Sequence, residues 1–464
     1  MVKVITYGTY DLLHYGHIRL LQRAKALGDY LIVGVTADDY DKTRGKINVQ
    51  QSLMERVEGV RATGLADEII IEEYEGQKID DIRRYDVDIF TVGSDWVGKF
   101  DYLKEYCQVI YLDRTEGVSS SEIRSVQRKI RLGLVGEPSI VAKVARECGC
   151  VNGLTVSGTC TQQEVEGYRN MPYESLLEES DALYIVSEPA RHYAQIRKAL
   201  EQGKHVLCET PMALSAEACT ELQEIAKKNH CVLMDAIKTA YATAYARMLL
   251  MVKSGKIGDV VSVEATATSL KDIVPIRENR TDTLWNSICD WGPTGMLPVF
   301  QLLGTHYRQK RIVSKMLHDQ FDLFTQIQFL YDGAVATVKV GKGVKSEGSL
   351  VISGTEGYVY VPAPWWKTEY FELRYEDQNS NKRYFYQLDG EGIRYELVAF
   401  LKAIQTGKDT SYISREVSNE ICKVIEDFYS KKDVVELTEK RRKAYGNVNT
   451  GTDQRSKGAG LPPG

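Results

Sequence analysis

The chain has 464 residues, of which 43% are hydrophobic and 27% charged, and its net charge at pH 7 is -5. This length predicts several domains, the composition is that of a soluble globular protein, and the charge excludes a general attraction to nucleic acid or anionic lipid. No apolar run approaches the ~18 residues of a membrane span and no basic-then-apolar leader precedes the first strand, so a cytoplasmic protein is expected.

A strand, a glycine-containing turn and a helix are predicted at the start of the chain. Residues 4–7 are apolar and β-branched and lead to Gly8, and His17 opens a helix with apolar residues at 18, 20, 21 and 24. In the turn, Asp11 precedes His14, and His14 and His17 lie three residues apart. A helix N-terminus after such a turn binds anions, and two imidazoles add donors for a phosphoryl group. The spacing favours nucleotidyl transfer over two structural histidines.

The first part of the chain, residues 1–127, alternates strands with helices. Strands are predicted at 30–35, 68–71, 88–92 and 109–112, and helices at 79–85 and from Ser121, which indicates a doubly wound parallel sheet. Three later segments are candidates to complete one site: the basic loop Arg44-Gly45-Lys46, the strand end Gly93-Ser94-Asp95-Trp96, and a strand-to-helix turn from Arg114 to Glu122. The alternatives are a solvated loop, a core tryptophan and simple helix capping.

A second alternating series begins at residue 130 and ends near Gly255. Its predicted strands are 130–135, 154–156, 182–186, 205–208 and 232–234, which indicates a second α/β domain over residues 128–255. From Val260 the pattern changes to long strand-like runs such as 324–329, 334–340 and 358–361, so residues 256–440 are predicted to form an α+β domain on an open sheet. Residues 441–464, rich in Gly, Asn, Thr and Pro, predict a flexible tail.

The motifs of residues 1 to 125 resemble the glycerol-3-phosphate cytidylyltransferase family. The family sequence Arg-Thr-Glu-Gly-Ile-Ser-Thr-Thr is matched from Arg114 to Ser121 with small hydroxyl substitutions, and residues 88–101 are also similar. Arg44 and Lys46 stand where the family has two lysines. The resemblance implies transfer of CMP from CTP, with Mg²⁺, to a polyol phosphate such as glycerol 3-phosphate, giving a CDP-alditol for cell-surface polymer synthesis. The alternative is a transferase of the same fold for another base or acceptor, such as an adenylyltransferase.

The resemblance also implies the residues of the site. The catalytic set is His14, His17, Lys46 and Arg114. The nucleotide-binding set is Thr9, Tyr10, Asp11, Arg44, Gly93, Asp95, Trp96, Thr115, Ser119, Ser120 and Ser121. No protein ligand for a metal is assigned. The nine cysteines include no Cys-x-x-Cys pair and are expected to be reduced and mostly buried.

From residue 130 to about 435 the chain resembles the glucose-fructose oxidoreductase and inositol dehydrogenase superfamily, most clearly at 203–211 and 254–260. The fold class is therefore expected to be α/β: a nucleotidyltransferase Rossmann-like domain, a dinucleotide-binding-type Rossmann domain, and an α+β open-sheet domain. The functional positions depart from the family. Gly136 is kept, but Pro138 replaces the second glycine of the phosphate turn, Thr210 replaces a lysine, and Thr294 replaces a histidine or tyrosine. No acidic residue for a ribose is found in 157–160.

These departures leave two readings of the second part. We favour loss of hydride transfer, with no NAD(P) bound and a role in positioning or in forming a homodimer or higher homo-oligomer. In the alternative, an active NAD(P)-dependent reductase uses Lys238 or Tyr241 and supplies the alditol phosphate. The aromatic segment 362–371 is predicted as an interface strand, with a sugar-type pocket as its alternative.

Overall fold

The computed structural model describes residues 1–37, 49, 51, 53–74, 76–113, 129–270, 286–318, 320–386, 388–407 and 411–437, and all structural statements concern these residues. Their strands form three sheets. Two are parallel and Rossmann-like and the third is mixed, so the expected α/β fold class is confirmed.

The first sheet has five parallel strands in the order β3-β2-β1-β4-β5. Its elements in chain order are β1 (Lys3–Gly8), α1 (Tyr15–Lys25), β2 (Tyr30–Thr36), α3 (Leu53–Ala62), β3 (Glu68–Glu72), α4 (Gln77–Tyr85), β4 (Ile89–Gly93), the 3-10 turns η1 (Ser94–Trp96) and η2 (Asp101–Glu105), and β5 (Gln108–Leu112). The chain winds outward from β1 to β3 and then from β4 to β5. The direction therefore reverses between the neighbouring strands β1 and β4, which is where open α/β sheets bind ligands.

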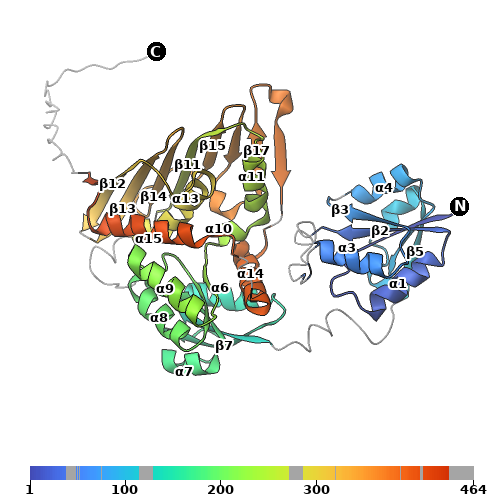
Figure 1. Ribbon diagram of the computed structural model, residues 1–464, viewed down its shortest axis with the longest axis horizontal. Coiled ribbons are helices and arrows are strands. Elements are labelled where there is room, and N and C mark those ends of the chain that lie inside the picture. Colours follow the sequence, from blue (N-terminus) through green and yellow to red (C-terminus); the bar gives the residue numbers. More distant parts are fainter. Residues whose placement is uncertain are drawn as a thin grey trace, which may run out of the picture.

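Helices cover both faces of this first sheet (Figure 1). On one face Leu21 of α1 and Val57 and Val60 of α3 are buried against the strands. On the other face Ile82 of α4 is buried with Ile5 and other strand residues. The first sheet thus has a complete core of its own.

The second sheet has five parallel strands in the order β10-β9-β8-β6-β7. Its elements are β6 (Ile130–Gly136), α6 (Pro138–Cys148), β7 (Leu154–Thr161), α7 (Tyr173–Glu179), β8 (Ala182–Val186), α8 (Pro189–Glu201), β9 (His205–Cys208), α9 (Ala216–Lys228), β10 (Leu233–Asp235), α10 (Lys238–Tyr241) and α11 (Thr243–Lys253). The strand β7 extends five residues beyond the predicted end at Val156, because the pairing with β6 resumes after a register shift at Gly133.

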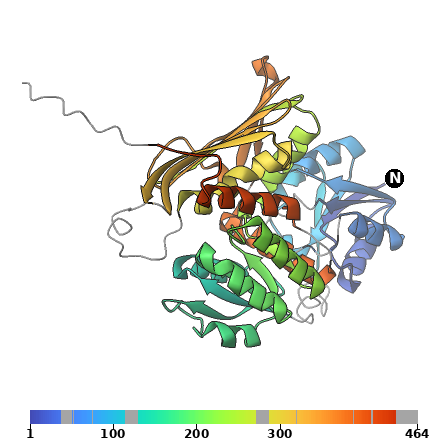
Figure 2. The same cartoon turned by 60° about the vertical axis from the view of Figure 1, so that its left-hand side comes forward.

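The third sheet has nine strands in the order β18-β17-β16-β15-β11-β14-β13-β12-β19. Its strands are β11 (Val260–Thr268), β12 (Gln309–His318), β13 (Phe321–Leu330), β14 (Val335–Gly341), β15 (Leu350–Gly354), β16 (Tyr358–Val361), β17 (Tyr370–Arg374), β18 (Lys382–Phe385) and β19 (Val434–Glu436). The other elements are α13 (Ser287–Leu303), η3 (Trp365–Lys367), η4 (Gln378–Ser380), η5 (Asp389–Gly392), α14 (Ile393–Thr406) and α15 (Arg415–Tyr429). Figure 2 shows α13 and α15 on one face of this curved sheet.

One hydrophobic core runs through the second and third sheets. It joins Leu134 of β6, Val338 of β14 and Phe400 of α14, all fully buried. The helix α14 returns from the third sheet to the second, where the Nε atom of Arg394 donates to a carboxylate oxygen of Glu147 on α6 at 2.7 Å. The limits 1–127, 128–255 and 256–440 stay predictions, and the predicted tail, 441–464, lies outside the described residues.

Most of the aromatic segment 362–371 is not the strand that we predicted, and its place at an interface stays a prediction. Trp365 is fully buried and donates from Nε1 to the carbonyl of Thr266 at 2.9 Å. The ring of Trp366 lies 4.8 Å from that of Trp291 on α13. An aromatic-rich composition does not reveal that a turn folds Trp365 back onto the core, and the strand β17 begins only at Tyr370.

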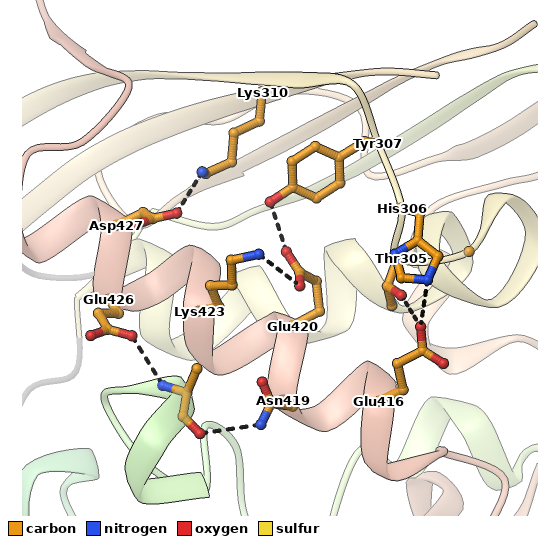
Figure 3. A network of polar contacts seen from close by, with 12 residues as sticks. Thr305, His306, Tyr307, Lys310, Glu416, Asn419, Glu420, Lys423, Glu426 and Asp427 are labelled. Atoms are coloured by element: carbon orange, nitrogen blue, oxygen red, sulfur yellow. Dashed lines mark hydrogen bonds and ion pairs between the residues drawn. The ribbon is translucent and has the colours of Figure 1, made fainter. Parts of the chain in front are cut away.

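The helix α15 is fixed to both sheets by polar contacts (Figure 3). On the side of the second sheet, the Nδ2 atom of Asn419 donates to the carbonyl of Ala216, and the Ala216 N–H donates to Glu426, both at 3.1 Å. On the side of the third sheet, the Tyr307 hydroxyl donates to Glu420 at 2.7 Å, and the Lys310 ammonium lies 2.5 Å from the Asp427 carboxylate. Both charged side chains of the last pair are almost fully buried.

No helix in the described part of the chain combines the length and apolarity that a membrane span requires. All nine cysteines are free thiols, and five of them are buried.

The buried ion pair of Figure 3 gives a test of how the two sheets are joined. The side chains of Lys310 and Asp427 are 4% and 7% exposed, so Lys310→Ala leaves a buried carboxylate without its main cation. We expect this variant to lower the unfolding free energy by about 3 kcal/mol in denaturant titrations followed by circular dichroism. Lys423→Ala is the control, because Lys423 is 46% exposed and its partner Glu420 keeps the hydrogen bond from the Tyr307 hydroxyl. Equal effects of the two substitutions would contradict this account.

Candidate functional site

Two of the predicted segments meet at one edge of the first sheet. The strands β1 and β4 are neighbours and parallel, so the turn after Gly8 and the turn after Gly93 leave the sheet at the same carboxyl edge. Thr9, Tyr10, Asp11, His14 and His17 follow the first strand, and Asp95 and Trp96 follow the second. This edge is also where the winding direction reverses.

His14 begins the helix α1 as its N-cap residue. Its backbone is extended, with φ -129° and ψ 174°, and its Nδ1 atom accepts a hydrogen bond from the Gly16 N–H at 3.1 Å. A neutral imidazole has one donor and one acceptor nitrogen, so an accepting Nδ1 places the proton on Nε2. The cap therefore leaves the Nε2–H of His14 as a hydrogen-bond donor.

His17 lies in the first turn of α1 and stacks on His14. The two ring centroids are 3.9 Å apart and the ring planes differ by 23°. The first turn of α1 contains no acidic residue, so no carboxylate on this turn opposes the positive end of the helix dipole. Two imidazoles side by side at such a helix end are suited to an anion with two neighbouring phosphoryl groups.

Tyr10 was predicted to bind nucleotide, but its side chain is only 1% exposed and belongs to the core of the first sheet. Its backbone is left-handed, with φ 53°, which turns the ring under His17 at a centroid distance of 5.5 Å and an interplanar angle of 69°. Gly8 makes room for this ring, since a Cβ there would lie 3.0 Å from it. The Tyr10 side chain thus packs beneath His17, and nucleotide binding at Tyr10 stays a prediction.

Asp11 is also buried, and its carboxylate accepts the N–H of Gln51 at 3.0 Å. The Gln51 side chain in turn accepts the N–H of Leu12 at 2.8 Å. These two bonds tie the turn after β1 to the segment that leads into α3.

Arg56 on α3 is a site residue that the sequence reasoning missed. It is fully buried, and its Nη1 atom donates to the carbonyls of Thr9 at 2.7 Å and Thr36 at 2.8 Å, while Nε donates to the carbonyl of Gln51 at 3.2 Å. One guanidinium thus joins three segments at the carboxyl edge. The sequence signal for this role was an arginine on the apolar face of a short helix, beside Val57 and Val60.

The segment after β4 forms the other side of the site. A Cβ added to Gly93 would meet no atom within 4 Å, so a ligand can approach the backbone there. Asp95 is exposed, and the half-buried Trp96 packs 5.8 Å from the Phe100 ring. The remaining predicted residues, Arg44, Lys46, Arg114, Thr115, Ser119, Ser120 and Ser121, lie outside the described residues.

The expected Mg²⁺ is consistent with this edge. No group of three His, Cys, Asp or Glu side chains in the described ranges is placed to hold a metal ion. Mg²⁺ at a triphosphate commonly uses one or two carboxylates and several phosphate oxygens, and such a metal needs no dedicated protein cage. Asp95 is an exposed carboxylate at this edge.

In the second part of the chain the positions compared with the family are placed as follows. Gly136 has φ 123°, and a Cβ there would lie 2.3 Å from the Val186 backbone, so the glycine is required. Pro138 is the first residue of α6 and supplies no N–H to the helix end. Thr210 is buried after β9, and Thr294 lies inside α13.

The predicted lack of an acidic residue after the second strand needs correction. Residues 157–160 lie within β7, which ends at Thr161. The positions that follow the strand are Gln162, Gln163 and Glu164, all exposed. A carboxylate is therefore present three residues beyond the strand, although nothing in the structure assigns it to a ribose.

Buried carboxyl groups gather near Lys238 at the start of α10. The Tyr184 hydroxyl contacts Glu209 at 3.2 Å and Glu396 at 3.1 Å. Burial raises the pKa of Glu209 to about 7, although the Lys238 charge opposes the rise, and burial raises the pKa of Glu396 well above its usual range. Tyr241, the other candidate, is buried and contacts the Asp235 carbonyl and the Ser411 hydroxyl, each at 3.3 Å.

Comparison with known proteins divides the chain at the same place as its cores. Residues 5–126 match the family model "Cytidylyltransferase-like". The glycerol-3-phosphate cytidylyltransferase of Bacillus spizizenii is 52% identical over 124 residues, which are 27% of this chain and 95% of that protein. The enzyme of the same name from Staphylococcus aureus is 49% identical over 128 residues, which are 27% of this chain and 93% of that protein.

The second part of the chain matches oxidoreductases. Residues 148–236 match the model "Oxidoreductase family, NAD-binding Rossmann fold". A 3-ketoreductase from Actinomadura kijaniata, solved with NADP and TDP-benzene, superposes with a TM-score of 0.59 at 17% identity, covering 67% of this chain and all of that one. A UDP-N-acetylglucosamine 3-dehydrogenase from Acidithiobacillus ferrooxidans gives 0.54 at 18% identity, covering 65% of this chain and all of that one. The chain therefore belongs, through its first part, to the glycerol-3-phosphate cytidylyltransferase family and carries an oxidoreductase-like domain in the rest.

Proposed function

We propose that this protein transfers CMP from CTP to a polyol phosphate such as glycerol 3-phosphate and releases pyrophosphate. The observation that carries the proposal is the stacked pair of His14 and His17 at the start of α1. The product is a CDP-alditol, an activated unit suited to building a cell-surface polymer. A pyrophosphate-release assay with each of the four nucleotides separates this function from that of an adenylyltransferase of the same fold.

The chemistry needs positioning and charge stabilisation rather than a covalent intermediate. An oxygen of the acceptor phosphate attacks the α-phosphorus of CTP in line, the bond to the β-phosphate oxygen breaks, and pyrophosphate leaves. The Nε2–H of His14 and the imidazole of His17 donate to the phosphoryl oxygens as charge develops on them. We assign Arg44, Lys46 and Arg114 to neutralising the pyrophosphate. Mg²⁺ bound with CTP supplies further neutralisation.

Removal of one histidine tests the site directly. We expect His17→Ala to lower the rate of CMP transfer by about 10²- to 10³-fold, because the transition state loses a preorganised donor. The measurement is pyrophosphate release with CTP and glycerol 3-phosphate at saturating concentrations. Arg19→Gln is the matched control on the same helix, since the Arg19 side chain donates to Gln22, one turn further along α1. Near-normal turnover by His17→Ala would refute the proposal.

The buried guanidinium of Arg56 provides a second test. Lysine keeps the charge but cannot reach three carbonyls in a fixed fork, so Arg56→Lys should loosen the turn that carries His14. We expect kcat to fall by about tenfold or more while circular dichroism stays native, because misplaced groups lose catalytic alignment. Arg61→Lys on the same helix is the control, because Arg61 is exposed and pairs with Glu58. If the kcat of Arg56→Lys is unchanged, Arg56 does not position the catalytic turn.

For the second part of the chain, we propose that hydride transfer has been lost and that the domain serves in positioning or in a homodimer or higher homo-oligomer. Three observations support this. Pro138 removes an N–H donor from the phosphate-binding helix end, and Thr210 and Thr294 replace groups that can carry a proton. The proximity of Lys238 to Glu209 favours the alternative, an active reductase that supplies the alditol phosphate.

A cofactor titration decides between these two readings. We expect no saturable fluorescence change when the full-length protein is titrated with NADH or NADPH up to about 1 mM, because a helix end without its first N–H donor binds a pyrophosphate poorly. Far-ultraviolet circular dichroism and a cooperative thermal transition of the same preparation show that the second part is folded, since CTP binding would report on the first sheet alone. Saturable binding of either reduced cofactor, followed by its oxidation with a keto-phosphate, would establish the reductase instead.

A further inference from the structure

Three lysines from separate elements meet at one carboxylate in the second part of the chain. The Nζ atoms of Lys143 on α6, Lys238 on α10 and Lys367 on η3 lie 3.7, 3.3 and 2.9 Å from the carboxylate oxygens of Glu391. These residues are far apart in the sequence, so the folded chain holds three like charges together with one opposite charge. Like charges at such separations repel unless an anion lies between them.

The carboxylate is presented by a backbone that favours few residues. Gly390, Glu391 and Gly392 have φ values of 57°, 56° and 91°, so three consecutive residues of η5 are left-handed, and Glu391 is the one with a side chain. Such conformations are costly for residues other than glycine and gather at ligand sites and switch regions. The three lysine side chains are 53%, 29% and 38% exposed, so solvent reaches them.

Other carboxyl groups nearby add little negative charge to this cluster. Glu147 is paired with Arg394 at 2.7 Å, and Asp290 with Lys342 at 2.8 Å. Burial raises the pKa of Glu209 to about 7 and raises the pKa of Glu396 well above its usual range, so burial disfavours the charged form of both groups. By contrast, the hydrogen bond from Lys367 lowers the pKa of Glu391 to about 2. Glu391 is therefore the main anion facing three ammonium groups.

Two packed tryptophans are connected to the segments that carry the lysines. Trp366 precedes Lys367 and its ring lies 4.8 Å from that of Trp291, and the Thr239 hydroxyl, next to Lys238, donates to the Trp366 carbonyl at 2.8 Å. The Nε1 atom of Trp291 is buried without a hydrogen-bond partner among the described residues. An apolar face beside a cluster of cations is the composition of a site for a small phosphorylated polyol or sugar.

We propose that Lys143, Lys238 and Lys367 form a binding site for a phosphoryl group, and that the Glu391 carboxylate occupies this site when no ligand is bound. A phosphate monoester carries two negative charges and three acceptor oxygens, which suit three ammonium groups better than one carboxylate does. Binding displaces Glu391 and releases the left-handed turn of η5. The site takes the phosphoryl group of a polyol phosphate, and it stands whether or not the first domain acts as proposed above.

Hydrogen exchange of the full-length protein tests the proposal at the site itself. Inorganic phosphate, glycerol 3-phosphate and NADPH are the probes, and the readout is the exchange of the peptide spanning 388–396. We expect inorganic phosphate and glycerol 3-phosphate to change this exchange. Binding at the first sheet changes peptides within 1–113 instead and is thereby distinguished. A response to NADPH alone would assign the phosphoryl group to a dinucleotide and overturn the choice of a polyol phosphate.

Substitutions give the second arm of the test. In calorimetric titrations with inorganic phosphate, Glu391→Gln should tighten this binding about tenfold, because the internal competitor loses its charge. Lys367→Met should weaken it by tenfold or more. Lys228→Met, an exposed lysine on α9, is the control and should leave it unchanged. If Glu391→Gln and Lys367→Met both bind phosphate as the original protein does, the site does not exist.

Discussion

The continuous hydrophobic core shared by the second and third sheets is the constraint on which the second part of the structure depends. Leu134, Val338 and Phe400 belong to one cluster although they come from three parts of the chain. Burial of apolar surface does not favour one orientation of the two sheets over another. The polar contacts of α15 fix the orientation, because they bind this helix to both sheets. Because this packing is rigid, side chains from α6, α10 and η3 are held at one place near Glu391.

The first sheet does not share this core. Its two clusters contain only residues up to Leu112, so the stability of the transferase site does not depend on burial against the rest of the chain. In the first sheet, the buried side chain of Arg56 holds separate segments together, as α15 does in the second part of the chain. It donates to carbonyl groups that a turn at the sheet edge leaves without backbone partners. A guanidinium has five donors in a fixed geometry, which explains why one side chain can organise three segments. The two parts thus reach a defined geometry by different means.

Local patterns predicted the strand, the turn and the helix that carry His14 and His17, because all three elements lie close together in the sequence. The stacking of His14 on His17 follows from their spacing in one helical turn. The burial of Tyr10 was not foreseen, because its left-handed backbone, which turns the ring into the core, goes with tertiary packing against Gly8. Arg56 and Trp365 were missed or misread for the same reason, since their partners are distant in sequence. The end of β7 shifted because pairing with β6 extends the strand.

The relation between the altered dehydrogenase positions and the lysine cluster follows from electrostatics. Thr210 and Thr294 carry no charge. The cations near the buried carboxyl groups are therefore the lysines that pair with Glu391 and with Asp290. A left-handed glutamate costs roughly 1–2 kcal/mol relative to a relaxed backbone, and three converging lysines add repulsion. A bound phosphate in place of the Glu391 carboxylate would relieve the lysine repulsion and free the left-handed turn. The cluster therefore argues that the second part still binds an anion, even where hydride transfer has been lost.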